Sequence, residues 1–258
     1  MSAVALDPAE ADRLIEGQGV PDADWRASPG LRATPVITIA ALLADVPRVV
    51  VVSPHPDDEV LGVGGLMALA RAIDVDVHVV AVTDGEACYP RDMRWSRAQL
   101  AAIRRTELHD ALDRLAPGIT VDALGIADGG VRAAGGDIEG HLRSHLRADD
   151  LLLLPWRHDG HPDHEGVALA GLAAANALGC RRLEFPVWGW HWAAPDAGLL
   201  PLARAVRIAL PTDVHARKQA ALDAFASQTG GGAFDIAHPI LPPWALARFQ
   251  RDFEVLFA

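Results

Sequence analysis

The sequence VVSPHPDDEVLGVGG, residues 51–65, places one histidine and three acidic residues in five positions directly after an apolar run. The run itself, RVVVVS at 48–53, is short and β-branched, which is typical of a strand buried on both faces of a parallel sheet. Charges at the end of a buried strand are costly unless a cation or a firm hydrogen-bond network compensates them. The stretch therefore predicts a buried strand followed by a functional loop.

Strand-like and helix-like segments alternate along the chain after this point. Strands are expected at 48–53, 75–85, 121–130 and 150–156, and helices at 59–73, 96–116, 137–148 and 165–179. Two late strands are expected within 181–190 and 203–211, followed by closing helices at 213–228 and 242–257. This alternation predicts an α/β, Rossmann-like fold, in which helices flank a mostly parallel sheet on both faces.

The length and composition indicate one domain. With 258 residues, of which 50% are hydrophobic, the chain can bury a sizeable core. We expect a single domain over 1–258, in which 1–46 form a leading arm or short helices and about 48–180 form the core of alternating strands and helices. No internal repeat is evident.

The charge and the apolar runs exclude several classes of partner. A net charge of −11 without a Lys/Arg-rich run disfavours nucleic acid and anionic membranes. No segment reaches the roughly 18 apolar residues of a membrane span, and the N-terminus lacks a signal-peptide pattern, so we predict a cytoplasmic protein. Cys88 and Cys180 lack CxxC spacing, which argues against a disulfide scaffold or a thiolate zinc site. Self-association as a homo-oligomer is left open.

A second cluster, RHDGHPDHEG at 157–166, follows the strand expected at 150–156. Because ligands lie at the carboxyl ends of parallel strands, we expect the two clusters to meet at one edge of the sheet. Imidazole and carboxylate ligands suit Zn²⁺ and also admit iron, cobalt or nickel. A catalytic zinc site usually has three protein ligands and one bound water molecule. The metal lowers the pKa of that water to about 7, and a nearby carboxylate can then take its proton. These residue types do not decide which aspartate binds and which acts as base.

HPDDE at 55–59 together with HPDH at 161–164 resembles the PIG-L/LmbE family of zinc-dependent de-N-acetylases. The resemblance covers about residues 48–180 and implies a Rossmann-like fold and hydrolysis of an N-acetyl group on an amino sugar. It also implies that His55, Asp58 and His164 bind the metal. Asp57 is then the general base. Pro54 stands where the family often has alanine, which does not threaten ligation.

The resemblance assigns further roles around this centre. His161 is expected to stabilise the tetrahedral intermediate or to protonate the amine, with Asp163 orienting it. Arg104 begins an Arg-x-x-Glu pattern and is expected to contact the substrate, the alternative being a surface ion pair with Glu107. Asp128, at the end of the third predicted strand, is a candidate for binding a sugar hydroxyl or for a turn.

We therefore expect a metal-dependent hydrolase that removes an N-acetyl or other short acyl group from a small amino-sugar compound by attack of metal-bound water. The expected cofactor is Zn²⁺, with Fe²⁺, Co²⁺ or Ni²⁺ as alternatives. The competing hypothesis is a non-catalytic, Rossmann-like module that binds a nucleotide or a sugar. That module would bind no metal, so metal analysis separates the two.

Three other features have alternative interpretations. The glycines at 62–65 fall too late for a dinucleotide fingerprint and indicate close packing of a helix on the sheet. Glu59 is expected to favour the start of that helix through its charge. The tryptophan-rich segment 188–192 indicates either packing or a stacking wall for a sugar ring. The segment 227–232 is expected to be a loop that could cover the pocket.

Overall fold

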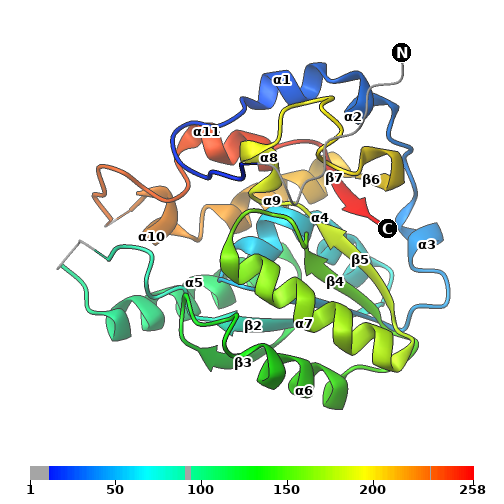
Figure 1. Cartoon of the computed structure of the whole chain (residues 1–258), viewed down its shortest axis with the longest axis horizontal. Coiled ribbons are helices and arrows are strands. Elements are labelled where there is room, and N and C mark those ends of the chain that lie inside the picture. The colour runs from blue at the N-terminus through cyan, green and yellow to red at the C-terminus, as the bar shows by residue number, and fades with distance from the viewer. Residues whose placement is uncertain (1–11, 91–93, 233) are drawn as a thin grey trace.

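A seven-stranded sheet forms the centre of the computed structural model, which describes residues 12–90, 94–232 and 234–258 (Figure 1). The strands are β1 (Arg48–Ser53), β2 (Asp76–Thr83), β3 (Thr120–Ile126), β4 (Leu151–Pro155), β5 (Arg181–Phe185), β6 (Ala205–Ala209) and β7 (Phe253–Phe257). They lie in the order β3-β2-β1-β4-β5-β7-β6. The first five are mutually parallel, and β7 is antiparallel to both of its neighbours. The predicted mostly parallel α/β sheet is confirmed.

Helices cover both faces of the sheet (Figure 1). One face carries α4 (Asp58–Ala72), α5 (Arg97–Leu115) and α9 (Thr212–Leu222), and the other carries α6 (Gly135–His145) and α7 (Pro162–Leu178). The shorter helices are α1 (Asp22–Ala27), α2 (Pro29–Ala33), α3 (Ile39–Leu42), α8 (Gly189–Trp192), α10 (Ala226–Thr229) and α11 (Pro243–Leu246), with 3₁₀ turns η1 (Leu202–Arg204) and η2 (Ala247–Phe249). In the part of the chain that the structure describes, no helix is both long and apolar enough to cross a bilayer.

Burial on both faces explains the apolar run of β1. Val49 and Val51 pack in the core beneath α4, α5 and α9, whereas Val50 and Val52 pack in the core beneath α6 and α7. All four side chains are buried. Successive strand residues point to opposite faces, so the middle of a central strand covered on both sides favours an apolar side chain at every position.

The glycines of α4 allow the helix to lie close to the sheet, as predicted. A Cβ atom on Gly62 would lie 2.2 Å from the ring of Phe185 on β5. A Cβ atom on Gly65 would lie 2.4 Å from the side chain of Leu210. Both distances are far below van der Waals contact, so these positions accept only glycine unless the helix moves.

Gly62→Ala is expected to lower the free energy of unfolding by about 1–3 kcal/mol, because the added methyl group overpacks the contact with Phe185. Chemical denaturation would measure this change in the free energy of unfolding, provided that the variant and the unmodified protein have the same m-value. Gly140→Ala is the matched control: this exposed glycine of α6 has nothing within 4 Å of an added Cβ, so helix propensity alone should make it neutral or stabilising. Equal stabilities of the two variants would contradict the packing argument.

A buried ion pair supports a bend in α4. Val63 has non-helical angles, φ −140° and ψ 20°. Beyond the bend, Glu254 of β7 accepts hydrogen bonds from the backbone N–H groups of Gly65 at 2.6 Å and Leu66 at 2.8 Å. Lys218 of α9 neutralises that carboxylate at 2.6 Å. The backbone donors released by the bend therefore keep partners, as a buried helix requires.

The leading segment packs on the late part of the chain. Trp25 of α1 is buried, its ring lies 4.9 Å from that of Trp190, and its Nε1 donates to the Trp190 carbonyl at 2.8 Å. The Ile37 N–H donates to the Arg207 carbonyl of β6 at 2.9 Å. Residues 12–46 thus contain short helices and are fastened to the body of the protein.

The helix predicted over 242–257 is wrong for its second half. The chain forms α11 and η2 and then enters the sheet as β7, between β5 and β6. A short run of mostly apolar residues does not distinguish a buried helix from a buried strand. Here two flanking strands offer backbone partners, and that tertiary pairing decides the conformation.

The strand order sets the place of the site. The chain passes from β1 outward to β2 and β3 on one side, and from β4 outward to β5 on the other. β1 and β4 are neighbours, so the loops that follow them leave the sheet side by side at its carboxyl edge. This is the switch point at which open α/β sheets form a crevice.

Candidate metal and catalytic site

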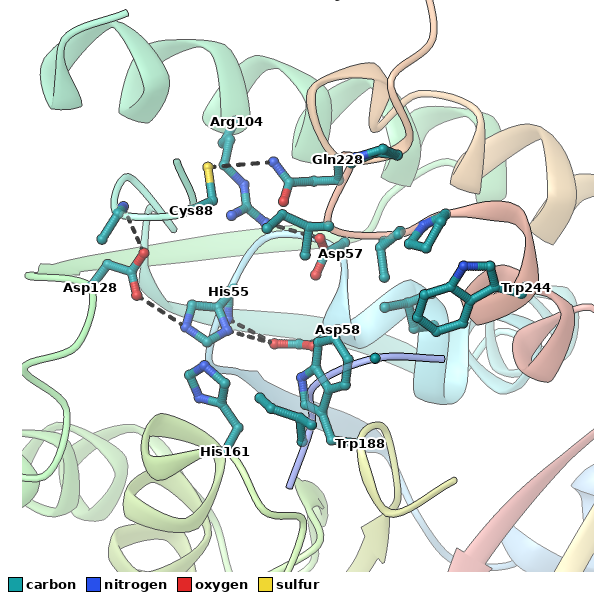
Figure 2. Close-up of a pocket in the computed structure, with 18 residues that line it drawn as sticks. His55, Asp57, Asp58, Cys88, Arg104, Asp128, His161, Trp188, Gln228 and Trp244 are labelled. Atoms are coloured by element: carbon teal, nitrogen blue, oxygen red, sulfur yellow. Dashed lines mark hydrogen bonds and ion pairs between the residues drawn. The ribbon is translucent and has the colours of Figure 1, made fainter. Parts of the chain in front are cut away.

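The loops after β1 and β4 bring the predicted metal ligands together around one carboxylate. Asp58 Oδ2 lies 3.1 Å from His55 Nδ1 and 3.1 Å from His164 Nε2. The backbone N–H of His55 donates to the same oxygen at 3.0 Å. Figure 2 shows Asp58 and His55 in contact with each other, with His161 beside His55. The residues assigned from both motif clusters therefore share one location.

Electrostatic interactions within this group are strong. Burial alone would raise the pKa of Asp58, but the His164 and His55 imidazoles hold it well below its usual range. Burial alone would lower the pKa of His164, but Asp58 and Asp159 raise it to about 9. Each group is buried and balanced chiefly by its neighbours, so a change in any one of them should affect the others.

Asp159, which the sequence analysis did not assign, holds His164 in place. Its carboxylate lies 2.8 Å from His164 Nδ1 and accepts the backbone N–H groups of Val187, Trp188 and Gly189 at 2.8–2.9 Å. A carboxylate only accepts, so Nδ1 carries a proton, and Nε2 is the ring nitrogen that a metal ion would bind in place of a second proton. An aspartate five residues before a histidine is no recognisable pattern, and only the fold reveals this contact.

The donor set fits a divalent transition metal. His164 Nε2 is buried and, among the described residues, makes no hydrogen bond of good geometry, although Asp58 Oδ2 lies 3.1 Å away. Ring nitrogens of His55, His161 and His164 lie within 4.8 Å of one another. Ligand atoms of a tetrahedral zinc ion are about 3.3–3.6 Å apart, which is close to the 3.1 Å contacts of Asp58. A cation there would satisfy the orphan nitrogen and offset the acidic side chains around it.

Asp57 lies beside this group in a strained conformation. Its φ of 130° is unusual for a residue other than glycine and is the kind of strain found at functional sites. Arg104 of α5 donates to its Oδ2 at 2.9 Å. Burial raises the pKa of Asp57 well above its usual range, and the Arg104 guanidinium opposes that rise. Arg104 therefore favours the ionised carboxylate that a general base needs.

The structure rules out the alternative interpretation of Arg104 as a surface residue. Its side chain is buried and also donates to the carbonyl oxygens of Gly85 at 2.9 Å and Pro56 at 2.6 Å. The alternative of a surface ion pair with Glu107 is wrong, because Glu107 accepts hydrogen bonds from the N–H and hydroxyl of Ser227 instead. Arg104 lines the cavity, so a contact with substrate stays a prediction.

Glu59, expected from the sequence only to stabilise the first turn of α4 through its charge, also makes hydrogen bonds to the end of β1 and the loop after it. It is buried, and its Oε2 accepts from the Ser53 hydroxyl at 2.6 Å and from the Asp57 N–H at 3.3 Å. Burial raises the pKa of Glu59 to about 7. Glu59 thus braces the loop that carries the candidate base.

The relation predicted between His161 and Asp163 is not the one observed. The Asp163 carboxylate accepts the Gly129 N–H at 2.8 Å and lies 3.3 Å from His55 Nε2. His161 is instead oriented by the Asp163 backbone N–H, which donates to His161 Nδ1 at 3.2 Å. The cause is local: His161 is the N-cap of α7, and its ring folds over the first-turn N–H groups. The sequence pattern cannot distinguish these two contacts.

The tautomer of His161 follows from that contact. Because Nδ1 accepts, the ring proton of the neutral form lies on Nε2, where it can be donated into the site. Burial and the nearby His164 and His55 rings lower the pKa of His161 to about 3, so the ring is neutral here. A neutral donor suits hydrogen bonding to a developing oxyanion.

Asp128 lies on the far side of His55. Its Oδ1 is 3.3 Å from His55 Nε2, and its Oδ2 accepts the Ala87 N–H at 2.7 Å. Burial alone would raise its pKa, but the contact with His55 lowers it to about 2. Asp128 is therefore an ionised carboxylate at the edge of the cavity.

The site opens into a cavity of about 470 Å³ (Figure 2). The residues that line it and that the prediction placed in the site are His55, Asp57, Asp58, Arg104, Asp128 and His161. Trp188, Gln228 and Trp244 also line it. Within the segment 188–192, Trp188 thus forms a wall of the cavity, whereas Trp190 packs on Trp25. Gln228 brings the segment 227–232 to the cavity, but its first residues belong to α10, so the predicted loop is wrong for 227–229, and a lid motion stays untested.

The comparisons with known proteins agree with this geometry. Residues 50–175 match the family model described as PIG-L, GlcNAc-PI de-N-acetylase. The chain is 27% identical to a 1D-myo-inositol 2-acetamido-2-deoxy-alpha-D-glucopyranoside deacetylase of Rhodococcus jostii, over 75% of this chain and 88% of the relative. It is 29% identical to the diacetylchitobiose deacetylase of Thermococcus kodakarensis, over 52% and 51% of the two chains.

The fold is similar to that of a solved structure, the N,N′-diacetylchitobiose deacetylase from Pyrococcus horikoshii. The TM-score is 0.54 at 22% identity, over 70% of each chain. The matched family region begins within β1 and ends within α7, and it carries both motif clusters at the switch point of the sheet. On the family match, residues 50–175 of the chain belong to the PIG-L family.

Proposed function

We propose that this protein is a metal-dependent hydrolase that removes an N-acetyl or other short acyl group from a small molecule containing an amino sugar. The observation that carries the proposal is the meeting of His55, Asp58 and His164 around one point, with Asp57 next to them in a cavity of substrate size. The relatives are named as deacetylases of N-acetylated amino sugars, which supports an amino-sugar compound as the substrate. The cytoplasmic location and self-association stay predictions from composition.

His55, Asp58 and His164 would hold the metal, and Zn²⁺ suits two imidazoles and one carboxylate. When bound, the ion would act as a Lewis acid that activates water and polarises the amide carbonyl. His164 offers Nε2 because Asp159 retains the proton on Nδ1. His161 is excluded as a ligand in this proposal, since its Nε2 carries the ring proton.

Asp57 and His161 would carry the proton transfers and the charge stabilisation. Asp57 takes a proton from the attacking water and can return it to the departing amine nitrogen. His161 donates its Nε2–H to the oxygen of the amide as negative charge develops there. Asp163 contributes through its backbone N–H to His161 and through its carboxylate to His55. Asp128 and Arg104 would contact the sugar or keep the neighbouring groups charged.

Arg104→Lys tests whether Arg104 acts on the substrate or on Asp57. Lysine keeps the charge. It has one nitrogen, however, and cannot reproduce the contacts of the two guanidinium nitrogens, one with Asp57 and the Pro56 carbonyl and the other with the Gly85 carbonyl. We expect kcat to fall about tenfold at neutral pH and the acid limb of its pH profile to move to higher pH. The reason is that weaker pairing lets the pKa of Asp57 rise by roughly one unit. An increase in KM with an unchanged kcat profile would instead mark a substrate contact.

The non-catalytic alternative makes opposite predictions. The family membership and the assembled site favour the hydrolase over a nucleotide- or sugar-binding module. Elemental analysis of purified protein should find a transition metal, and a chelator should abolish amine release from a panel of N-acyl amino sugars. Restoration of that activity by added Zn²⁺ would identify a competent metal. Binding of sugars without amine release, unaffected by chelation, would support the binding module.

A further inference from the structure

A second group of imidazole and carboxylate side chains lies at the opposite edge of the sheet from the catalytic residues. His78 and Asp122 are each the third residue of their strands, β2 and β3, whereas the catalytic loops follow the strand ends. The register pairs Val80 with Asp122, so His78 and Asp122 point to the face covered by α6. His141 and His145 come from the last turns of that helix. Three separate elements thus supply this cluster.

The distances match a shared ion. Asp122 Oδ2 lies 3.3 Å from His78 Nε2 and 3.5 Å from His141 Nε2. Ligand atoms of Asp122, His141 and His145 all lie within 4.8 Å of one another. The first two distances agree with the roughly 3.3–3.6 Å between ligand atoms of a tetrahedral zinc ion. His141 and His145, four residues apart on a helix, stack with ring centroids 4.0 Å apart, so they face the same side.

The hydrogen bonds of the rings leave lone pairs for a metal. His145 Nδ1 donates to the His141 carbonyl at 2.8 Å, so its proton is on Nδ1 and its Nε2 is a free acceptor. His78 Nδ1 lies 2.7 Å from the Thr120 hydroxyl, which holds that ring with Nε2 toward Asp122. In the part of the chain that the structure describes, the buried His141 Nε2 makes no hydrogen bond, although Asp122 Oδ2 lies 3.5 Å away. Such outer contacts are the usual support of metal-binding histidines.

We propose that Asp122, His141 and His145, with His78 beside Asp122, form a second metal site, which binds a divalent transition-metal ion, with Zn²⁺ the best match to this ligand set. The site joins the end of α6 to the beginnings of β2 and β3. It is independent of the catalytic centre and of the proposed reaction. Its effect is on stability, because an ion that binds only the folded protein shifts the folding equilibrium.

Titration of Zn²⁺ alone into chelator-stripped protein, followed by calorimetry and elemental analysis, tests the proposal. The unmodified protein should bind two equivalents. His145→Ala, an exposed change that leaves the core intact, should lose one equivalent or weaken it at least tenfold while keeping amine release. His55→Ala should lose the other equivalent and keep this one. His109→Ala, an exposed histidine of α5 outside both clusters, is the control and should keep two.

Thermal unfolding gives a second measurement. Zn²⁺ should raise the Tm of His55→Ala, in which only the second site remains, and should not raise that of the double variant His55→Ala/His145→Ala. Mg²⁺ should have no effect, because imidazole ligands do not favour it. The proposal is overturned if His145→Ala binds as much Zn²⁺ as the unmodified protein with equal affinity. If the proposed catalytic metal site is wrong, the unmodified protein should instead lack the Zn²⁺ equivalent that depends on His55.

Discussion

Asp57→Asn is expected to lower kcat by about 10²–10⁴-fold, the usual contribution of a general base, while the protein keeps its metal. An amide at this position cannot take a proton from water. Asparagine tolerates positive φ better than most residues, so the strained backbone at φ 130° should be retained. The measurement combines amine-release kinetics with the metal content of the purified variant.

Asp84→Asn is the matched control for this variant. Asp84 also follows a strand at this edge of the sheet, but it pairs with Arg105 at 2.8 Å and lies outside the residues that line the cavity. It should keep near-normal turnover. If Asp57→Asn deacylates at the rate of the unmodified protein, Asp57 is not the base. If it loses metal, Asp57 is a ligand and the base must be sought among the other carboxylates of the cavity.

Asp159→Asn is expected to weaken metal binding and activity by about 100-fold or more. The carboxylate of Asp159 meets four donors, namely His164 Nδ1 and three backbone N–H groups. In either orientation of the asparagine side chain, its NH₂ group would point at groups that are themselves hydrogen-bond donors, and those groups would lose their acceptor. The simplest relief is a change of His164 tautomer, which places the proton on Nε2 and removes the metal ligand. A wrong tautomer costs about 10⁴-fold in a serine protease triad, and outer-shell mutations cost about 10–100-fold in metal affinity.

Calorimetric titration of Zn²⁺ and kinetics at increasing metal concentration would measure this effect. Added metal should restore part of the activity of Asp159→Asn, which a purely structural defect would not allow. Asp150→Asn is a suitable control, because Asp150 is another fully buried aspartate, but it pairs with Arg48 at the other end of the sheet. It should lose stability and keep metal affinity. Equal metal affinities of the two variants would refute the proposed role of Asp159.

Local pattern explains why much of the fold was predictable. The run 48–53 is apolar on both faces because β1 packs against helices on both sides, and this pattern is visible without any tertiary contact. The helix predicted over 96–116 begins with a Ser96–Gln99 capping box and ends before Pro117, so its signals are also local. By contrast, β7 depends on two neighbouring strands distant in sequence, and its apolar run alone favours helix and strand alike.

The same division holds for the site. By itself, the sequence determined which residue types stand at the ends of β1 and β4, and strand order then required those loops to meet at one edge. Only the tertiary structure decided the partners. In the folded protein, Arg104 donates a hydrogen bond to Asp57, and the Asp163 carboxylate contacts His55. Asp159 links His164 to the loop after β5. Hydrogen bonds act over about 3 Å between groups far apart in the chain, so motif spacing carries no record of them.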